Sequence, residues 1–187
     1  MRGFAKREAK ASFRSENNGA NRGHSSSAVN LGEPGRVAES QCKIVLNHSL
    51  SIPPTDEAVL SFGQTPIESL MEWSKTKIKT LKNYGITEER IILDPGIGFG
   101  KSALQSLCLL QDIDRLKELG CEILVGHSRK SFFKLISNAP AIERDPETLG
   151  VSMTLAKKGV DYLRIHNVAA HQQSLSAAAW MDGQYVL

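Results

Sequence analysis

The sequence predicts an α/β fold built on a parallel β-sheet, and three observations support this prediction. Between residues 41 and 187, short apolar segments alternate with longer stretches of helical periodicity, and the alternation occurs four times. No β-hairpin turn signal separates the apolar segments, and strands joined by helical crossovers pair in parallel. The 41% hydrophobic and 23% charged fractions are typical of a globular protein with a buried core. We therefore expect four consecutive β/α units.

The first unit starts with residues 43–47 (KIVLN), which have the composition of a buried strand, followed by the Pro-rich loop SIPPTDE. A helix is expected to begin at Thr65, because Pro66 then occupies the first helical position and Glu68 completes a capping box. Gly85 is the expected end of this helix. Its apolar face is predicted to consist of Ile67, Leu70, Met71, Ile78 and Leu81.

The second unit has a strand at residues 91–93, the loop DPGIGFGKS and a helix that ends at Gly120. The apolar residues of that helix are Leu104, Leu107, Leu110, Ile113 and Leu116. The third unit has a strand at residues 122–125, the loop GHSRKS, the apolar helical turn FFKLI, and a helix from Asp145 to Gly159. The fourth unit has a strand at residues 161–165, then HNV and a final Ala-rich helix.

Residues 1–40 differ in composition from the rest of the chain. They hold seven basic and four acidic side chains with six Ser, five Gly and four Asn, whereas residues 41–187 hold sixteen basic and sixteen acidic side chains. Such a segment buries too little apolar area to offset chain entropy, so we predict a disordered tail before a domain at 41–187. The spaced basic residues of this tail are also typical of an organellar transit peptide, but Glu8 and Glu16 argue against that interpretation.

Composition also excludes several function classes. The net charge of +3 lies in residues 1–40, so no basic stripe remains for nucleic acid. No apolar run reaches the length of a membrane-spanning helix, and no secretory signal is visible. The three cysteines, Cys42, Cys108 and Cys121, are widely spaced and odd in number, which favours free thiols in a reducing compartment. We expect a cytoplasmic protein without a nucleic-acid or membrane partner.

Polar and glycine residues follow each strand at its carboxyl end, where parallel α/β folds bind ligands. Asp94, Gly96, Gly98 and Lys101 follow the second strand, Ser128 to Ser131 the third, and Arg164 and His166 end the fourth. Several cations around one carboxylate predict an anionic ligand with a polar head. The loop DPGIGFGKS is not a Walker A motif, because Pro95 stands at its first glycine position, and the third glycine of a dinucleotide fingerprint is replaced by Lys101.

Three motifs together resemble one known family. DPGIGFGK, GHSRKSF and RIHNV, in this order and each after a predicted strand, are similar to the last three β/α loops of dihydropteroate synthase, and the resemblance extends over about residues 37–180. That family is a (β/α)₈ barrel that condenses a dihydropterin methyl diphosphate with p-aminobenzoate in folate biosynthesis. The resemblance therefore implies a transferase, and the chain would supply the C-terminal half of the barrel.

The resemblance also implies residue roles. Asp94 would accept hydrogen bonds from the N–H edge of the pterin, and Lys130 would donate to its carbonyl and ring nitrogen. Arg164 and His166 would hold the leaving diphosphate, so Lys130, Arg164 and His166 are the predicted catalytic residues. The predicted substrate-binding residues are these three with Asp94, Gly98 in the glycine-rich loop, Phe99 lining the aminobenzoate channel and Ser131 near its carboxylate.

Each assignment has a simpler alternative. Asp94 before Pro95 is also typical of a turn cap, Arg129 and Lys130 of a solvated pair, and His166 of a core histidine. We interpret His48, His127 and His171 as structural. The family's Met-His-Met after the first strand is here Asn47-His48-Ser49, its His-Asn pair after DPGIGFGK is Gln105-Ser106, and the Asp of its R-x-H-D-V is Asn167.

The resemblance implies Mg²⁺ as a cofactor, but the usual protein ligand belongs to an N-terminal N-x-T-P-D-S-F segment that has no counterpart here, so no metal ligand is assigned. We expect a truncated transferase that needs a complementing N-terminal half or a second copy of itself. A broken or misread reading frame would produce the same sequence. The alternatives in other classes are a non-catalytic pterin- or phosphate-binding open α/β module and a structural remnant that binds no pterin.

Overall fold

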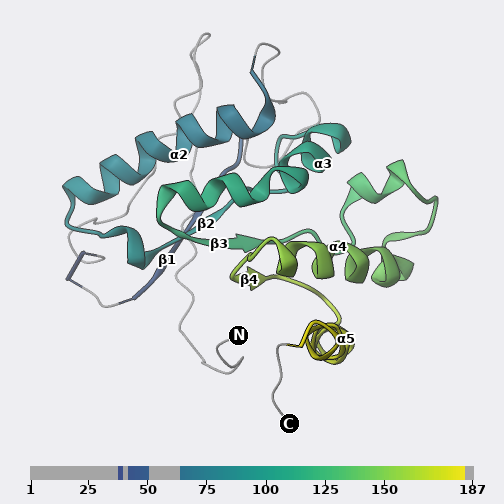
Figure 1. Ribbon diagram of the computed structural model, residues 1–187. Helices are drawn as coiled ribbons and strands as arrows, with labels where there is room; N and C mark the ends of the chain where they lie inside the picture. Colours follow the sequence, from purple (N-terminus) through teal and green to yellow (C-terminus); the bar gives the residue numbers. More distant parts are fainter. Residues whose placement is uncertain (1–37, 40–41, 51–63, 184–187) are drawn as a thin grey trace.

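The computed structural model describes residues 38–39, 42–50 and 64–183, and it contains a four-stranded parallel sheet (Figure 1). The strands are β1 (Ile44–Asn47), β2 (Ile91–Asp94), β3 (Glu122–Val125) and β4 (Tyr162–Leu163). They lie in the order β1-β2-β3-β4, so each strand pairs with the next one along the chain. Asn47 pairs with Asp94, and Val125 pairs with Leu163. The four predicted β/α units are confirmed.

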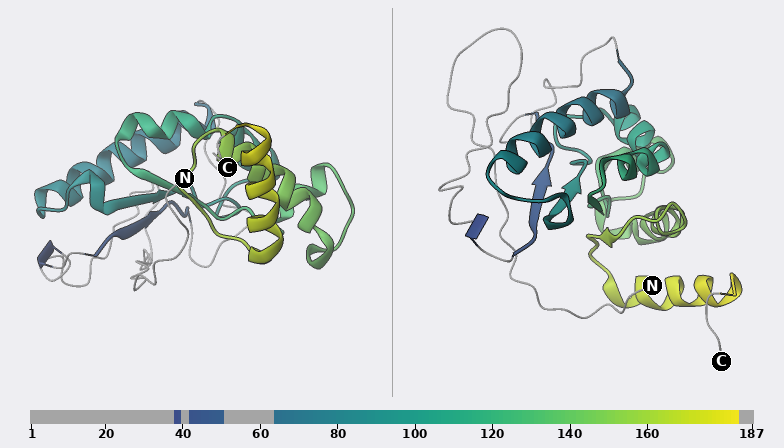
Figure 2. Two further views of the ribbon diagram at one scale, coloured as in Figure 1. Left: turned by 60° about the horizontal axis from the view of Figure 1, so that its bottom comes forward. Right: turned by 60° about the vertical axis from the view of Figure 1, so that its left-hand side comes forward.

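Helices cover one side of this sheet (Figures 1 and 2). They are α2 (Pro66–Asn83), α3 (Ala103–Gln111), α4 (Asp145–Lys157) and α5 (Val168–Met181). The shorter 3₁₀ elements are η1 (Glu88–Arg90), η2 (Ile113–Leu119), η3 (Ser131–Leu135) and η4 (Ala141–Glu143). Sequential strand order with helices on a single side is the winding of a β/α barrel, because a doubly wound sheet places helices on both faces.

The helix termini follow from local sequence. Thr65 accepts a hydrogen bond from the Glu68 amide, and the Glu68 carboxylate accepts one from the Thr65 amide, which is the predicted capping box. The chain turns after α2 at Gly85 and after η2 at Gly120, with φ of 81° and 72°. Both values lie in the left-handed region that glycine adopts without a steric penalty.

The core lies between the sheet and the helices. It joins strand residues such as Leu93 and Ile123 to helix residues such as Leu70, all three with no exposed surface. Leu104 departs from the predicted apolar face, because 63% of it is exposed. Residues spaced by three turn about 60° around a helix at each step, so the run that begins at Leu104 rotates away from the buried side occupied by Leu110.

Three predicted elements differ from the structure. The helix after the second strand ends at Gln111 and continues as η2, and the FFKLI segment is the 3₁₀ element η3. The fourth strand was expected over 161–165, but β4 has only two residues. The Asp161 side chain accepts the hydrogen bond of the Ile123 amide and thereby replaces a strand-to-strand bond. The predicted tail and the Pro-rich loop lie outside the described residues, apart from Ala38 and Glu39, and Ala38 packs against the core.

Candidate functional site

Asp94 is the carboxylate at the centre of the strand ends. It is the last residue of β2 and only 1% of it is exposed. The Gly96 amide donates to Asp94 Oδ1 at 2.8 Å, which fixes the orientation of the carboxylate. Oδ2 lies 3.2 Å from Arg164 Nη2 and accepts no hydrogen bond within the described part of the chain. A buried carboxylate oxygen without a hydrogen-bond donor is costly, so Oδ2 is suited to a donor on a ligand.

Lys130 and Phe99 meet beside this carboxylate. Lys130 Nζ lies 4.3 Å from the centroid of the Phe99 ring, within the range of a cation–π contact. Burial lowers the pKa of the Lys130 ammonium, repulsion from Arg164 lowers it further, and Asp94 opposes both effects. Gly98, with φ of 77°, passes so close that a Cβ there would lie 3.4 Å from Lys130 Cδ. The structure therefore brings together five of the predicted site residues, which are Asp94, Gly98, Phe99, Lys130 and Arg164.

Lys101 has a different role from the one its place after β2 predicts. Its Nζ donates to three backbone carbonyls, those of His48 at 3.3 Å, Gly96 at 3.0 Å and Phe99 at 3.1 Å. Only 9% of the residue is exposed, and burial lowers the pKa of its ammonium to about 7 against the attraction of Asp94. The expectation that Lys101 joins the cations facing a ligand is wrong, because its donors hold the loop after β2 against the loop after β1.

The two predicted anion-binding residues both contact the loop that follows β3. Arg164 leaves β4 and lies over Gly126, the residue directly after β3. Ser128 Oγ lies 2.8 Å from His166 Nδ1, and the same oxygen accepts a hydrogen bond from the His166 amide at 3.3 Å. His166 is exposed, so it is not a core histidine. Ser131 is exposed at the start of η3, one residue beyond Lys130.

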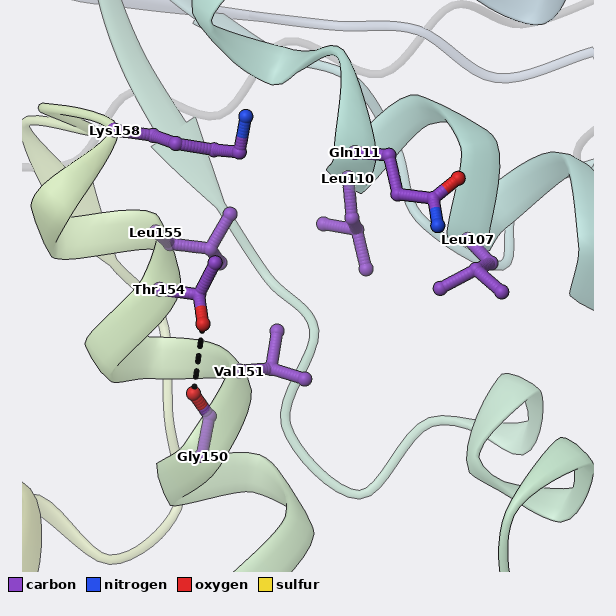
Figure 3. Close-up of a pocket in the computed structure, with 8 residues that line it drawn as sticks. All are labelled: Leu107, Leu110, Gln111, Gly150, Val151, Thr154, Leu155 and Lys158. Carbon is purple, nitrogen blue, oxygen red and sulfur yellow. Dashed lines mark hydrogen bonds between the residues drawn. The ribbon is translucent and has the colours of Figure 1, made fainter.

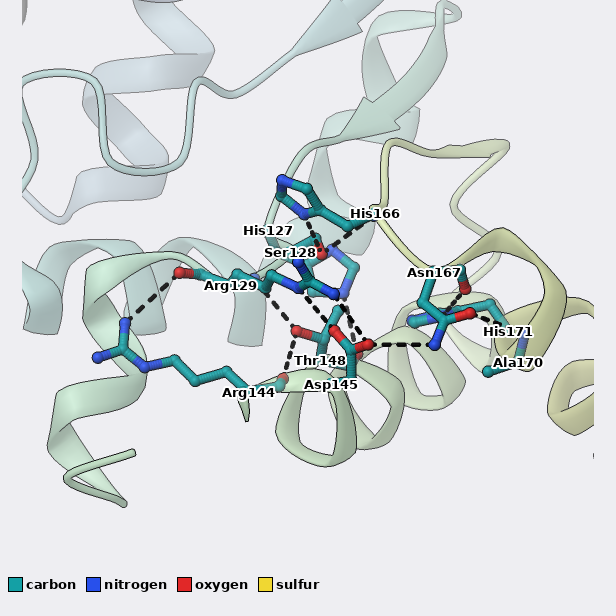
Figure 4. A network of polar contacts seen from close by, with 10 residues as sticks. All are labelled: His127, Ser128, Arg129, Arg144, Asp145, Thr148, His166, Asn167, Ala170 and His171. Atoms are coloured by element: carbon teal, nitrogen blue, oxygen red, sulfur yellow. Dashed lines mark hydrogen bonds and ion pairs between the residues drawn. The ribbon is translucent and has the colours of Figure 1, made fainter. Parts of the chain in front are cut away.

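Arg129 points into a polar network that stiffens the β3 loop (Figure 4). Its Nε and Nη2 donate to the two oxygens of Asp145 at 2.8 and 3.0 Å, and its φ of 59° is the only positive value among the non-glycine residues that the structure describes. Asn167 donates to the same Asp145 and caps α5 by accepting from the Ala170 amide. Bonds from Arg129 and Asn167 lower the pKa of Asp145 to about 2. Arg129 is thus part of the scaffold.

Three histidines pack inside the fold, in agreement with a structural role. His127 Nε2 lies 3.1 Å from the Thr148 carbonyl oxygen and 2.9 Å from Ser152 Oγ, and burial lowers its pKa to about 4. His48 packs edge-on against Trp73, with ring centroids 4.7 Å apart. His171 is 2% exposed, and its Nδ1 lies 2.7 Å from the Asn167 carbonyl oxygen.

A cavity of about 280 Å³ lies elsewhere, between α3 and α4 (Figure 3). It is lined mainly by apolar side chains, among them Leu107, Leu110, Val151 and Leu155. No group of His, Cys, Asp or Glu residues that could hold a metal ion occurs within 38–39, 42–50 and 64–183. Asp94, the carboxylate of this site, contacts an amide and a guanidinium, and these contacts do not fit a Mg²⁺ ligand.

Sequence comparison decides the family. The profile described as pterin binding enzyme matches residues 30–166. The chain belongs to this family. It is 44% identical over 137 residues to the folate synthesis bifunctional protein of Chlamydia caviae, an alignment that covers 73% of this chain and 31% of that protein. The matched region begins at residue 30 and so includes part of the segment predicted as a tail.

Solved structures support the same assignment. Dihydropteroate synthase from Anaplasma phagocytophilum with bound 6-hydroxymethylpterin-monophosphate superposes with a TM-score of 0.75 at 37% identity, over 82% of this chain and 60% of that one. The enzyme from Xanthomonas albilineans in complex with 7,8-dihydropteroate has a TM-score of 0.70 at 28% identity, over 84% and 58%. The four β/α units are the C-terminal half of a (β/α)₈ barrel, and this family member spans less than two thirds of each relative.

Gly126 and Arg144 contact the site but were not singled out from sequence, and Ser128 was named only as a polar residue after the third strand, without a role. Gly126 and Ser128 touch Arg164 and His166, and both occur in the GHSRKS motif, which is the signal that could have revealed them. Arg144 is 6% exposed and donates to the carbonyl of Lys130 at 3.1 Å, a contact that no motif indicates. Among the described helices, none has the length and apolarity needed to cross a membrane.

Proposed function

We propose that this chain binds a dihydropterin diphosphate and forms the pterin side of a dihydropteroate synthase active site. The observation that carries the proposal is the buried Asp94, whose Oδ2 accepts no hydrogen bond from the described residues and lies among the cations Lys130 and Arg164. The two solved relatives hold a pterin monophosphate and 7,8-dihydropteroate, which supports the same ligand class.

Asp94 has the properties needed to recognise the pterin. A carboxylate accepts charge-assisted bonds from neighbouring ring and amino N–H groups, and burial makes an unpaired acceptor selective for a ligand that supplies them. The Gly96 amide holds one carboxylate oxygen, so the other keeps a fixed direction. Lys130 has three N–H donors and lies beside Asp94, so its ammonium donates to the carbonyl and ring nitrogen of the same ligand.

The transfer step needs a stabilised leaving group. The C–O bond between the pterin methylene and the diphosphate breaks with its electron pair on oxygen, the amine nitrogen of p-aminobenzoate forms the new C–N bond, and the amine loses a proton. Arg164 supplies a guanidinium fork and His166 a ring N–H to the departing diphosphate, which is electrostatic stabilisation of developing charge. Phe99 packs against Lys130 and lines the approach of the aromatic amine, and Ser131 lies near its carboxylate.

A non-catalytic pterin- or phosphate-binding module is the second candidate, and the partial coverage of each relative favours testing it. Calorimetry of the full chain with the pterin diphosphate, with and without p-aminobenzoate, separates the two. Formation of dihydropteroate and inorganic diphosphate supports the transferase and excludes the module. Binding without turnover supports the module. Absence of pterin binding contradicts both and leaves a structural remnant.

We further propose that residues 41–187 form a partial pterin-binding barrel domain that works in the cytoplasm. A second copy of the chain or a complementing barrel half packs along the sheet. The buried Cys121 and the exposed Cys108 form no disulfide within the described residues, which is compatible with a reducing compartment. Within the described residues, β1 and β4 each pair with one neighbour only. Light scattering after size-exclusion chromatography tests the second copy: a mass of twice 20.5 kDa supports it, and a monomer excludes it.

A further inference from the structure

Two small residues of the β3 loop lie directly under the two anion-binding residues of the β4 end. Gly126 contacts the guanidinium of Arg164, and Ser128 contacts the imidazole of His166. We propose that Gly126 and Ser128 are positioning residues that hold Arg164 and His166 in place for the leaving diphosphate. The inference rests on the proposed function, because it takes the diphosphate as the ligand of that pair.

Gly126 leaves the space in which the guanidinium lies. A Cβ built on Gly126 would lie 2.6 Å from Arg164 Nη2, 2.8 Å from Nε and 3.1 Å from Cζ, so the guanidinium is packed against the Gly126 backbone. In this place the guanidinium also reaches Asp94 Oδ2 at 3.2 Å. Gly126 does not have a positive φ, so alanine can adopt its backbone conformation. The obstacle to a methyl group is the end of a flexible side chain, which can move away without strain in the fold.

Ser128 sets the hydrogen-bonding state of His166. Only 5% of Ser128 is exposed, and its oxygen already accepts a hydrogen bond from the His166 amide at 3.3 Å. The hydroxyl hydrogen then requires an acceptor, and His166 Nδ1 lies 2.8 Å away. We assign the neutral imidazole of His166 from this network as the tautomer with its proton on Nε2. The ring N–H that remains is the one turned away from Ser128, on an exposed side chain.

The Gly126–Arg164 and Ser128–His166 contacts have the same effect on anion binding. They fix a guanidinium and a ring N–H before an anion arrives, so less side-chain freedom is lost on binding and the donors need no reorganisation during reaction. The loop that provides them is itself held in place, because Arg129 is bound to Asp145 and Arg144 donates to the Arg129 carbonyl at 3.4 Å (Figure 4). The β3 loop is thus a rigid support for residues that belong to the next strand.

The test uses the full chain with Gly126→Ala, Ser128→Ala and Ser128→Thr, with Gly150→Ala as the matched control because no atom lies within 4 Å of its added Cβ. Calorimetry measures binding of the pterin diphosphate and of inorganic diphosphate, and thermal unfolding measures stability. We expect Gly126→Ala and Ser128→Ala each to weaken binding of both ligands about tenfold or more, with little change in the unfolding midpoint. Ser128→Thr keeps the hydroxyl, so we expect it to bind both ligands about as tightly as the wild type. Gly150→Ala should also bind as the wild type does.

A readout without ligand separates this inference from the proposed function. Two-bond ¹H–¹⁵N correlation spectra of the free chain report the His166 tautomer, and the Arg164 Nε resonance reports the guanidinium environment. We expect the Nε2–H form in the wild type, a mixture in Ser128→Ala, and a shifted Arg164 signal in Gly126→Ala only. A wild type that binds no pterin diphosphate overturns the proposed function, and these spectra still decide the positioning. Unchanged affinity in both alanine variants, or an Nδ1–H tautomer in the wild type, overturns the positioning while the proposed function stands.

Discussion

Replacing Lys101 with methionine tests how the loop after β2 is held. The Lys101 ammonium donates to three backbone carbonyls, and only 9% of the residue is exposed. Methionine has a similar length but no donor and no charge. The variant therefore removes both the cost of burying an ammonium and the three hydrogen bonds that offset it.

The sign and size of the pH effect follow from the pKa. Burial lowers the pKa of Lys101 from 10.5 to about 7 in the folded chain. Between these values the unfolded chain holds a proton that the folded chain lacks, so the Lys101 contribution to stability rises with pH. The difference of about 3.5 units corresponds to an upper limit of about 5 kcal/mol at about 1.4 kcal/mol per unit. Below pH 7 both states are protonated, and this contribution stays constant.

The assay is urea unfolding of the wild type and Lys101→Met across pH 6 to 10.5, and the quantity of interest is the difference in unfolding free energy at each pH. Subtraction removes titrations common to both chains, including that of Cys121, whose pKa burial raises to about 11. Lys157→Met is the control, because 64% of the Lys157 side chain is exposed, and its difference should stay within about 0.5 kcal/mol. We define the difference as the unfolding free energy of the wild type minus that of Lys101→Met, and it should rise with pH. A difference that stays flat or falls as pH rises would refute the buried-ammonium account.

Three further predictions concern the framework of the site. Gly96→Ala should lower the unfolding free energy by at least about 2 kcal/mol in urea titration, because φ is 66° and the added Cβ would overlap the His48 carbonyl oxygen; a neutral effect would contradict the close approach. Thr65→Ala should cost about 1 kcal/mol by the same measurement through loss of the capping box, and no loss would exclude the cap. Asp145, whose pKa is lowered from 3.8 to about 2 by Arg129, stabilises the chain above pH 4 and loses this effect as pH falls towards 2. Acid unfolding should show Asp145→Asn less stable than the wild type above pH 4, with the difference vanishing near pH 2.

The elements that sequence predicts well here depend on local interactions. The start of α2 follows from Thr65, Pro66 and Glu68, which interact within a single turn. The convergence of Asp94 with Arg164 was also predictable, because the carboxyl ends of parallel strands share one edge. Both predictions required only chain order and short-range chemistry.

The remaining features depend on direction in space, which residue order does not specify. Asp94 ends β2 and Lys101 lies in the loop after it, but the Lys101 side chain points to backbone carbonyls rather than to the site. The exposure of Leu104 depends on which side of α3 faces the sheet. The contact of Gly126 with Arg164 joins two different strand ends, so it becomes visible only when the strands are placed side by side.

The most direct test of the central claim is binding of 6-hydroxymethylpterin-monophosphate, the ligand of the Anaplasma relative, to the full chain with Asp94 intact or changed to asparagine. The amide replaces one carboxylate acceptor with an N–H donor facing the N–H edge of the pterin, so we predict saturable binding to the wild type and a loss of about 100-fold or more in Asp94→Asn. Asp114→Asn, on an exposed carboxylate paired with Lys158, should bind as the wild type does. Equal affinity in Asp94→Asn, or no binding to the wild type, would contradict the assignment of Asp94 as the pterin-recognition residue.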